Sequence, residues 1–229
     1  KIDKQILFNA VCKENKSKSI KFLLENAQVD VNAKLTSGDF LLKMALKNNN
    51  LDIFYLLLNH TGIEIEPYIF DNCMLIKELN ISQSVKNIKP YTFYNFNSLT
   101  SITIQSPITS IENNTFEKCK NLIHIKLPSS ITCIGNFAFS GCSKLTKIEL
   151  PLLLTQIGDF AFYGCSSLPQ ISIPSSVTQI GDGTFRECSS LTQISIPSSV
   201  TQIGNSAFYG CSSLTQISIP SSVTQIGSS

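Results

Sequence analysis

Apolar residues over most of the chain recur with a spacing of 23 residues. The string CSSLTQISIPSSVTQIG begins at Cys188 and again at Cys211, and near copies begin at Cys142 and Cys165. A phenylalanine series keeps the same spacing without an insertion: Phe70, Phe93, Phe116, Phe139, Phe162, Phe185 and Phe208. A fixed period of this length is typical of stacked repeats that bury one another's faces. The pattern therefore predicts a solenoid of about seven units over residues 65–229.

Within each copy, the apolar positions predict extended segments. The L-x-x-I-x-I segment that begins at Leu191 ends in the alternation of a half-buried strand. Pro197 cannot donate a hydrogen bond to a ladder, so we expect the strand to end there. Val200 and Ile203 point inward from a second extended piece, and residues 207–211 predict a short helical turn that returns the chain to the next strand.

The first 64 residues have a helical period instead. The segments ILFNAV and SIKFLLENAQ, followed by FLLKMAL and LDIFYLLLNH, predict two pairs of helices. Ala10 and Ala45 are 35 residues apart, as are Phe22 and Leu57, so the second pair repeats the first. Two such pairs bury little surface by themselves, and no Pro/Gly/Ser-rich linker separates them from Ile65. We therefore expect the helices to pack on the first coil and cap it.

Both patterns are similar to known repeat families. The motif LTQISIPSSVTQIG, followed by a phenylalanine and CSS, resembles the leucine-rich repeats of BspA-like surface proteins over residues 65–229, and residues 1–64 resemble two ankyrin repeats. Together the resemblances imply an α/β repeat solenoid: a right-handed leucine-rich-repeat coil with a parallel concave β-sheet, capped by N-terminal ankyrin-like α-helix pairs. The first resemblance also implies adhesion or partner binding at a cell surface, without a catalytic centre.

Composition and charge narrow the classes of function. Hydrophobic residues make up 42% of the chain and charged residues 15%, which excludes a disordered chain. The net charge is only +2, so no basic excess points to nucleic acid or to an anionic membrane surface. The longest apolar run, Ile53–Leu58, is too short to span a bilayer. The first 15 residues carry charges and the last copy is incomplete, so we expect no signal peptide here and a longer natural gene product.

Polar residues alternate with the inward residues on the first strand of each copy, and these are the candidate binding residues. They are Glu78 and Asn80, Ser101 and Thr103, His124 and Lys126, Lys147 and Glu149, Gln170 and Ser172, Gln193 and Ser195, and Gln216 and Ser218. The middle of this face is charged, and its C-terminal part carries glutamine and serine. His124, Lys126, Lys147 and Glu149 form the predicted contact patch for a protein partner. The alternative is that the polar rows only keep the array soluble.

No pattern in the sequence indicates catalysis, a metal or a cofactor. The two histidines, His60 and His124, are far apart in the chain, and no motif brings a nucleophile to a base. The eight cysteines include no C-x-x-C pair, so we expect no zinc site. Stacked coils bring repeated cysteines within disulfide reach, but we favour free, buried thiols. Cys133 replaces an outward glutamine and is expected to be exposed.

The resulting hypothesis is a monomeric, non-enzymatic module that binds another protein. The family resemblance favours a cell-surface adhesin that contacts host-cell or matrix proteins. An intracellular scaffold is the alternative, which the ankyrin resemblance, the absent signal and the unpaired thiols favour. A third reading is a variable spacer without a discrete partner, because the copies after Cys142 are nearly identical. We expect no nucleic-acid partner and no insertion of this segment into a membrane.

Overall fold

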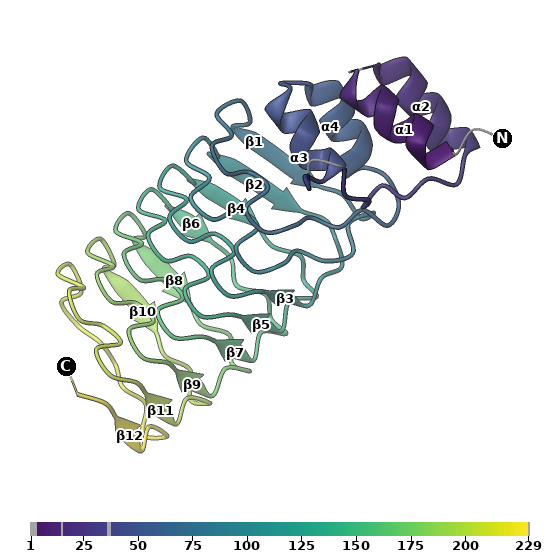
Figure 1. Ribbon diagram of the computed structural model, residues 1–229. Coiled ribbons are helices and arrows are strands. Elements are labelled where there is room, and N and C mark those ends of the chain that lie inside the picture. Colours follow the sequence, from purple (N-terminus) through teal and green to yellow (C-terminus); the bar gives the residue numbers. More distant parts are fainter. Residues whose placement is uncertain (1–3, 15, 36–37, 229) are drawn as a thin grey trace.

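A computed structural model describes residues 4–14, 16–35 and 38–228. Four short helices precede a stack of coils whose strands lie side by side along the molecule (Figure 1). The helices are α1 (Lys4–Lys13), α2 (Ser17–Asn26), α3 (Leu41–Lys47) and α4 (Leu51–Leu58). The two predicted helix pairs are therefore present, because α1 packs on α2 and α3 packs on α4.

The helices also pack against the first coil. Phe54 of α4 is fully buried, and its ring meets the ring of Phe70 edge-on, with 5.9 Å between the centroids. Asn32 joins the loop before α3 to the start of the coil: its Nδ2 donates to the carbonyl oxygen of Gly62, and its Oδ1 accepts from the amide of Glu64, both at 2.9 Å. Helices and coils thus share one hydrophobic core. The ankyrin resemblance and the boundary between the two expected domains stay predictions.

Parallel strands line one side of the coils and form the first sheet. They are β1 (Glu78–Ile81), β2 (Ser101–Ile104), β4 (His124–Lys126), β6 (Lys147–Ile148), β8 (Gln170–Ser172) and β10 (Gln193–Ser195). Pairing runs β1-β2-β4-β6 and β8-β10, and Ile102, Ile125 and Ile148 share one register row. The predicted parallel solenoid is confirmed, with about six turns. Residues 214–220, the matching part of the next copy, are not in a strand.

A second set of short parallel strands follows the proline-containing turn of each copy and forms the second sheet. It contains β3 (Ser110–Ile111), β5 (Cys133–Ile134), β7 (Gln156–Ile157), β9 (Gln179–Ile180), β11 (Gln202–Ile203) and β12 (Gln225–Ile226). Val200 is fully buried and Ile203 is 5% exposed. The prediction of a second extended piece with these two residues pointing inward is therefore confirmed.

The repeated phenylalanines form one buried column. The rings of Phe116, Phe139, Phe162 and Phe185 are fully buried, and successive centroids lie 5.3, 5.3 and 5.7 Å apart with planes within 6° of parallel. A cysteine column runs beside it, in which each Sγ donates to a phenylalanine carbonyl oxygen 26 residues earlier, as Cys142 does to Phe116 at 3.1 Å. Each coil therefore supplies apolar partners and a hydrogen bond to its neighbour.

The cysteines whose side chains the structure describes are free thiols. Those of the column are buried, as expected, but the prediction for Cys133 is wrong because this residue is only half-buried. In the second sheet Cys133 lies between Ser110 of β3 and Gln156 of β7, and these two strands cover its flanks. Longer outward side chains on an inner strand, such as His124 and Lys126 of β4, stay exposed, whereas the short cysteine side chain is half covered.

The segment that returns the chain to the next strand is a series of turns, so the predicted helical turn at 207–211 and its counterparts is wrong. Every second backbone amide here bonds to the next coil, as the amide of Phe139 donates to the carbonyl oxygen of Ala161 at 2.8 Å. Phe137 and Phe160 have φ of 56° and 55°, in the left-handed region. Such residues interrupt a right-handed helix, and their amides donate hydrogen bonds to the next coil instead.

Candidate binding face

The outward side chains of the first sheet form two rows that cross the strands. His124 and Lys126 of β4 are exposed, while Ile125 between them is only 8% exposed. The parallel register places His124 beside Lys147 in one row and Lys126 beside Thr103 in the other. A polar residue at an outward position is therefore repeated on the neighbouring coil, at the spacing of adjacent strands.

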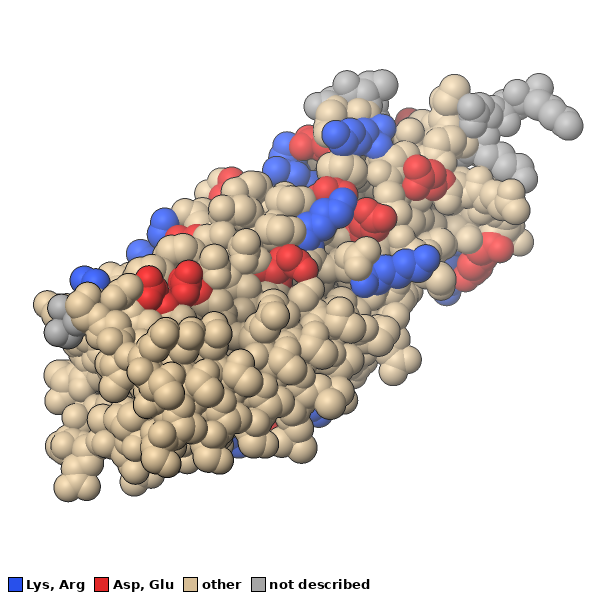
Figure 2. Space-filling model, turned by 90° about the horizontal axis from the view of Figure 1, so that it is seen from below, with Lys and Arg blue, Asp and Glu red and all other residues tan. Residues whose placement is uncertain are grey.

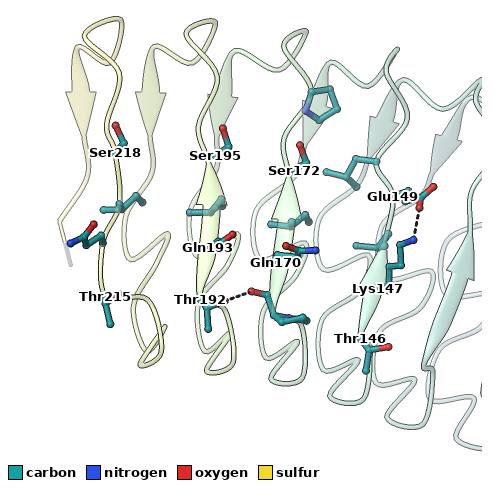
Figure 3. Close-up of a pocket in the computed structure, with 18 of the residues that line it drawn as sticks. Thr146, Lys147, Glu149, Gln170, Ser172, Thr192, Gln193, Ser195, Thr215 and Ser218 are labelled. Atoms are coloured by element: carbon teal, nitrogen blue, oxygen red, sulfur yellow. Dashed lines mark hydrogen bonds and ion pairs between the residues drawn. The ribbon is translucent and has the colours of Figure 1, made fainter.

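A groove of about 1290 Å³ lies over β6, β8, β10 and the segment 215–218. Eight of the candidate residues line it, and five of them are Lys147, Glu149, Gln170, Gln193 and Gln216. Ser172, Ser195 and Ser218 line it as well, and they lie along the second row (Figure 3). The other candidates belong to the same sheet but not to the lining of this groove: Glu78, Asn80, Ser101, Thr103, His124 and Lys126.

Charge on the groove is confined to its β6 end. Lys147 Nζ lies 2.7 Å from Glu149 Oε1, and both side chains are largely exposed. The hydrogen bond from Lys147, then its charge, lowers the pKa of the Glu149 carboxyl, and Lys126 adds to this. Because exposed ion pairs contribute little to stability, the pair sets the charge pattern of the face rather than holding the fold.

The remaining coils contribute no charged side chain to the groove. From Leu150 onward the sequence has only four charged residues: Asp159, Asp182, Arg186 and Glu187. None of these lines the groove, whose floor over β8 and β10 carries glutamine, serine and threonine. Figure 2 shows the same trend on the face seen from below, where a wide area of the C-terminal coils is free of charged side chains.

A leucine at the rim of the groove is a site residue that the sequence analysis missed. Leu152 lines the groove and is 86% exposed, and Leu153 beside it is 60% exposed. The signal was present in the sequence, since this copy has Leu-Leu where later copies have Ser-Ser after the proline. This replacement alone does not show whether the two leucine side chains are buried or exposed.

The side chains that line the groove offer hydrogen bonds and, at its β6 end, charge. Among residues 4–14, 16–35 and 38–228, no group of three or more His, Cys, Asp or Glu side chains could hold a metal ion. Burial raises the pKa of Cys119 and of Cys188 to about 12, and it raises that of Cys142 and Cys165 well above the usual value. These thiols are therefore protonated and poorly nucleophilic at neutral pH. In the part of the chain that the structure describes, no helix has the length and apolarity needed to cross a membrane.

Comparison with known proteins identifies the repeats. Residues 45–152 and 109–229 match the BspA type leucine rich repeat region, which has six copies here. The chain therefore belongs to the BspA-type leucine-rich-repeat family.

Solved structures are similar as well. A leucine-rich repeat protein from Bacteroides ovatus is 29% identical with a TM-score of 0.58, over 72% of this chain and 49% of that one, so this chain spans about half of its length. A leucine rich repeat protein from T. pallidum is 23% identical with a TM-score of 0.50, over 61% of this chain and 78% of that one, and it shows the fold alone. No curated protein matches the chain.

Proposed function

We propose that this protein is a non-enzymatic module that binds a protein partner on the concave face of its first sheet. The observation that carries the proposal is the pair of outward rows, held in register across the strands and opening into one groove. A partner meets side chains whose backbone is already fixed, so binding loses little conformational entropy. The proposed contact patch is His124, Lys126, Lys147 and Glu149, with the uncharged rows as its continuation.

The finer proposal is adhesion at a cell surface, by a monomer that contacts a host-cell or matrix protein. The resemblance to BspA-like surface proteins supports it, together with the family match over residues 45–229. The other residues proposed to contact the partner are Glu78, Asn80, Gln170, Gln193 and Gln216, which extend the same two rows.

An intracellular scaffold is the second candidate. The free state of Cys73, Cys119, Cys133, Cys142, Cys165, Cys188 and Cys211 favours it, because a reducing compartment keeps thiols unpaired. Location separates the two candidates. We expect protease treatment of intact cells to remove an adhesin and to leave a scaffold untouched, with a cytoplasmic protein of the same cells as the control for lysis.

The binding experiment compares two charge-reversed variants on a panel of immobilised matrix proteins. Lys126→Glu with Lys147→Glu reverses the sign of the patch, and we expect at least tenfold weaker binding of the matrix protein that the unchanged chain binds. Lys120→Glu with Lys144→Glu is the matched control, because it changes the net charge equally through exposed lysines in the turns before β4 and β6. Equal loss in both variants contradicts a role of the patch, and an unchanged chain that binds no matrix protein contradicts adhesion.

A further inference from the structure

Leu152 and Leu153 interrupt a pattern that four other copies keep. Copies with Ser-Ser after the proline lie at 129–130, 175–176, 198–199 and 221–222. The turn itself is unchanged, because the amide of Leu154 donates to the carbonyl oxygen of Pro151 at 3.0 Å, as Val177 does to Pro174. The two leucines thus occupy the central positions of a standard turn, and their side chains are 86% and 60% exposed.

This replacement brings no gain to the free protein. In the later copies the second serine holds the preceding coil, since Ser199 Oγ donates to the carbonyl oxygen of Val177 at 2.7 Å and Ser222 Oγ to that of Val200 at 2.8 Å. Leu153 stands at the same position of its turn and has no hydroxyl to donate. Because both leucines are largely exposed, their burial does not compensate for that hydrogen bond. The two adjacent leucines instead form a small apolar patch beside polar side chains, which is the arrangement found at interaction sites.

The leucines lie where the concave face changes from charged to uncharged side chains. Leu152 lines the groove together with Lys147 and Glu149 of the same copy, which is the last copy with charged residues on this face. Lys126 of the preceding coil is close enough to lower the pKa of Glu149. Two lysines and one carboxylate leave an excess of positive charge beside the exposed leucines. This corner therefore combines an apolar contact with a cationic one.

We propose that the corner formed by Lys126, Lys147, Leu152 and Leu153 binds an extended protein segment that carries an acidic and an apolar side chain. The proposal rests on the concave-face function and names the chemistry of its partner. The carboxylate pairs with the lysines, and the apolar side chain covers Leu152. Lys147 and Leu152 are five residues apart in this chain, and an extended segment rises roughly 3.3 Å per residue. The bound segment therefore carries its two side chains within about five residues of each other.

The test selects random linear peptides displayed on phage against the unchanged chain. We expect the enriched peptides to combine Asp or Glu with a large apolar residue at that spacing. Leu152→Ser with Leu153→Ser restores the serines of the neighbouring copies and should fold normally. It is expected to bind these peptides at least tenfold more weakly, since burial of one leucine corresponds to roughly 10- to 100-fold in affinity. Met74→Ser, which removes a side chain that is 74% exposed and outside the groove lining, is the matched control and should bind as before.

The outcomes separate this inference from the concave-face function. If the peptides bind the serine variant as tightly as the unchanged chain, the inference is overturned. The concave-face function still stands in that case if the same peptides no longer bind the variant with Lys126→Glu and Lys147→Glu. Peptides indifferent to both variants contradict both proposals. The inference also fails if no peptide is enriched, or if sedimentation shows a dimer that the serine variant dissociates, because a second copy would then be the occupant.

Discussion

The interior of the solenoid and its concave face follow opposite rules. In the interior, each coil repeats the same side chains, so that Phe116, Phe139 and Phe162 stack with rings nearly parallel and cysteines form a column beside them. On the face, the same register carries lysine and glutamate in one coil and glutamine and serine in the next. Because both sets of residues recur at fixed positions of the same 23-residue repeat, the fold can stay constant while the surface changes. Stability and the proposed recognition therefore belong to different positions of one repeat.

The largest expected effect comes from a gap in the interior column. Phe139→Ala removes a fully buried ring with a stacked neighbour on each side, and we expect it to lower the free energy of unfolding by about 3–5 kcal/mol. Phe137→Ala is the control two residues away, since Phe137 is 37% exposed and stacks on Phe160 at 5.1 Å. Its expected loss is about 1 kcal/mol. Urea unfolding measures both values, and equal losses contradict the separation of interior and surface.

A smaller effect is expected where a glycine lies against the backbone of the neighbouring coil. A Cβ on Gly158 would lie 2.6 Å from the backbone nitrogen of Asn136, which cannot move without shifting the coil, and we expect Gly158→Ala to destabilise by about 1–3 kcal/mol. At Gly181 the only contact below 3.4 Å is with Oδ1 of the Asp159 side chain. That side chain can rotate away, losing its hydrogen bond to the amide of Asp182. Gly181→Ala should therefore destabilise less, and the reverse order would contradict this packing of the coils.

The cysteine column predicts a loss of stability in alkali. Burial raises the pKa of Cys119 and Cys188 to about 12 in the folded chain, whereas unfolded thiols ionise near pH 8.5. The unfolded state therefore binds fewer protons between these values, and the free energy of unfolding falls as pH rises. The contribution of the thiols is complete below about pH 8.5 and is lost as pH approaches their folded pKa of about 12.

Urea midpoints at neutral pH and at about pH 10 measure this decline. Cys119→Ala with Cys188→Ala removes two of the titrating groups, so its midpoint should fall less between the two pH values, although the variant starts from a lower stability. An equally steep fall in the variant would assign the alkaline loss to other groups, such as the lysines. This comparison tests the interior while leaving every side chain of the concave face in place.

The repeat spacing was sufficient to predict the fold of the solenoid. A period of 23 residues without insertions fixes which side chains lie above one another, so the Phe139 column and the outward rows follow from the sequence. The alternation on each first strand was equally informative, because one face of the strand must point inward. The expected residues of the concave face do lie there, from Glu78 to Gln216, and their role in binding stays a prediction.

Other features depend on contacts between coils that a single repeat does not reveal. The sequence of the returning segment predicts a helical turn. In the structure, however, Phe137 and Phe160 have left-handed φ values, because backbone hydrogen bonds join their coils. Phenylalanine has no intrinsic preference for that conformation, so the sequence gives no warning of it. Cys133 is covered by β3 and β7 for the same reason. The exposed Leu152 could be placed on the groove only once the turn that carries it was known.

The central claim, that recognition belongs to the concave face, is tested most directly by hydrogen–deuterium exchange. The chain is compared alone and in complex with the matrix protein recovered from the binding panel. We predict slower exchange for amides of β4, β6, β8 and β10 in the first sheet, with unchanged exchange in β5, β7, β9 and β11 of the second sheet. Protection of the second sheet or of the helices, with the first sheet unchanged, would contradict the account.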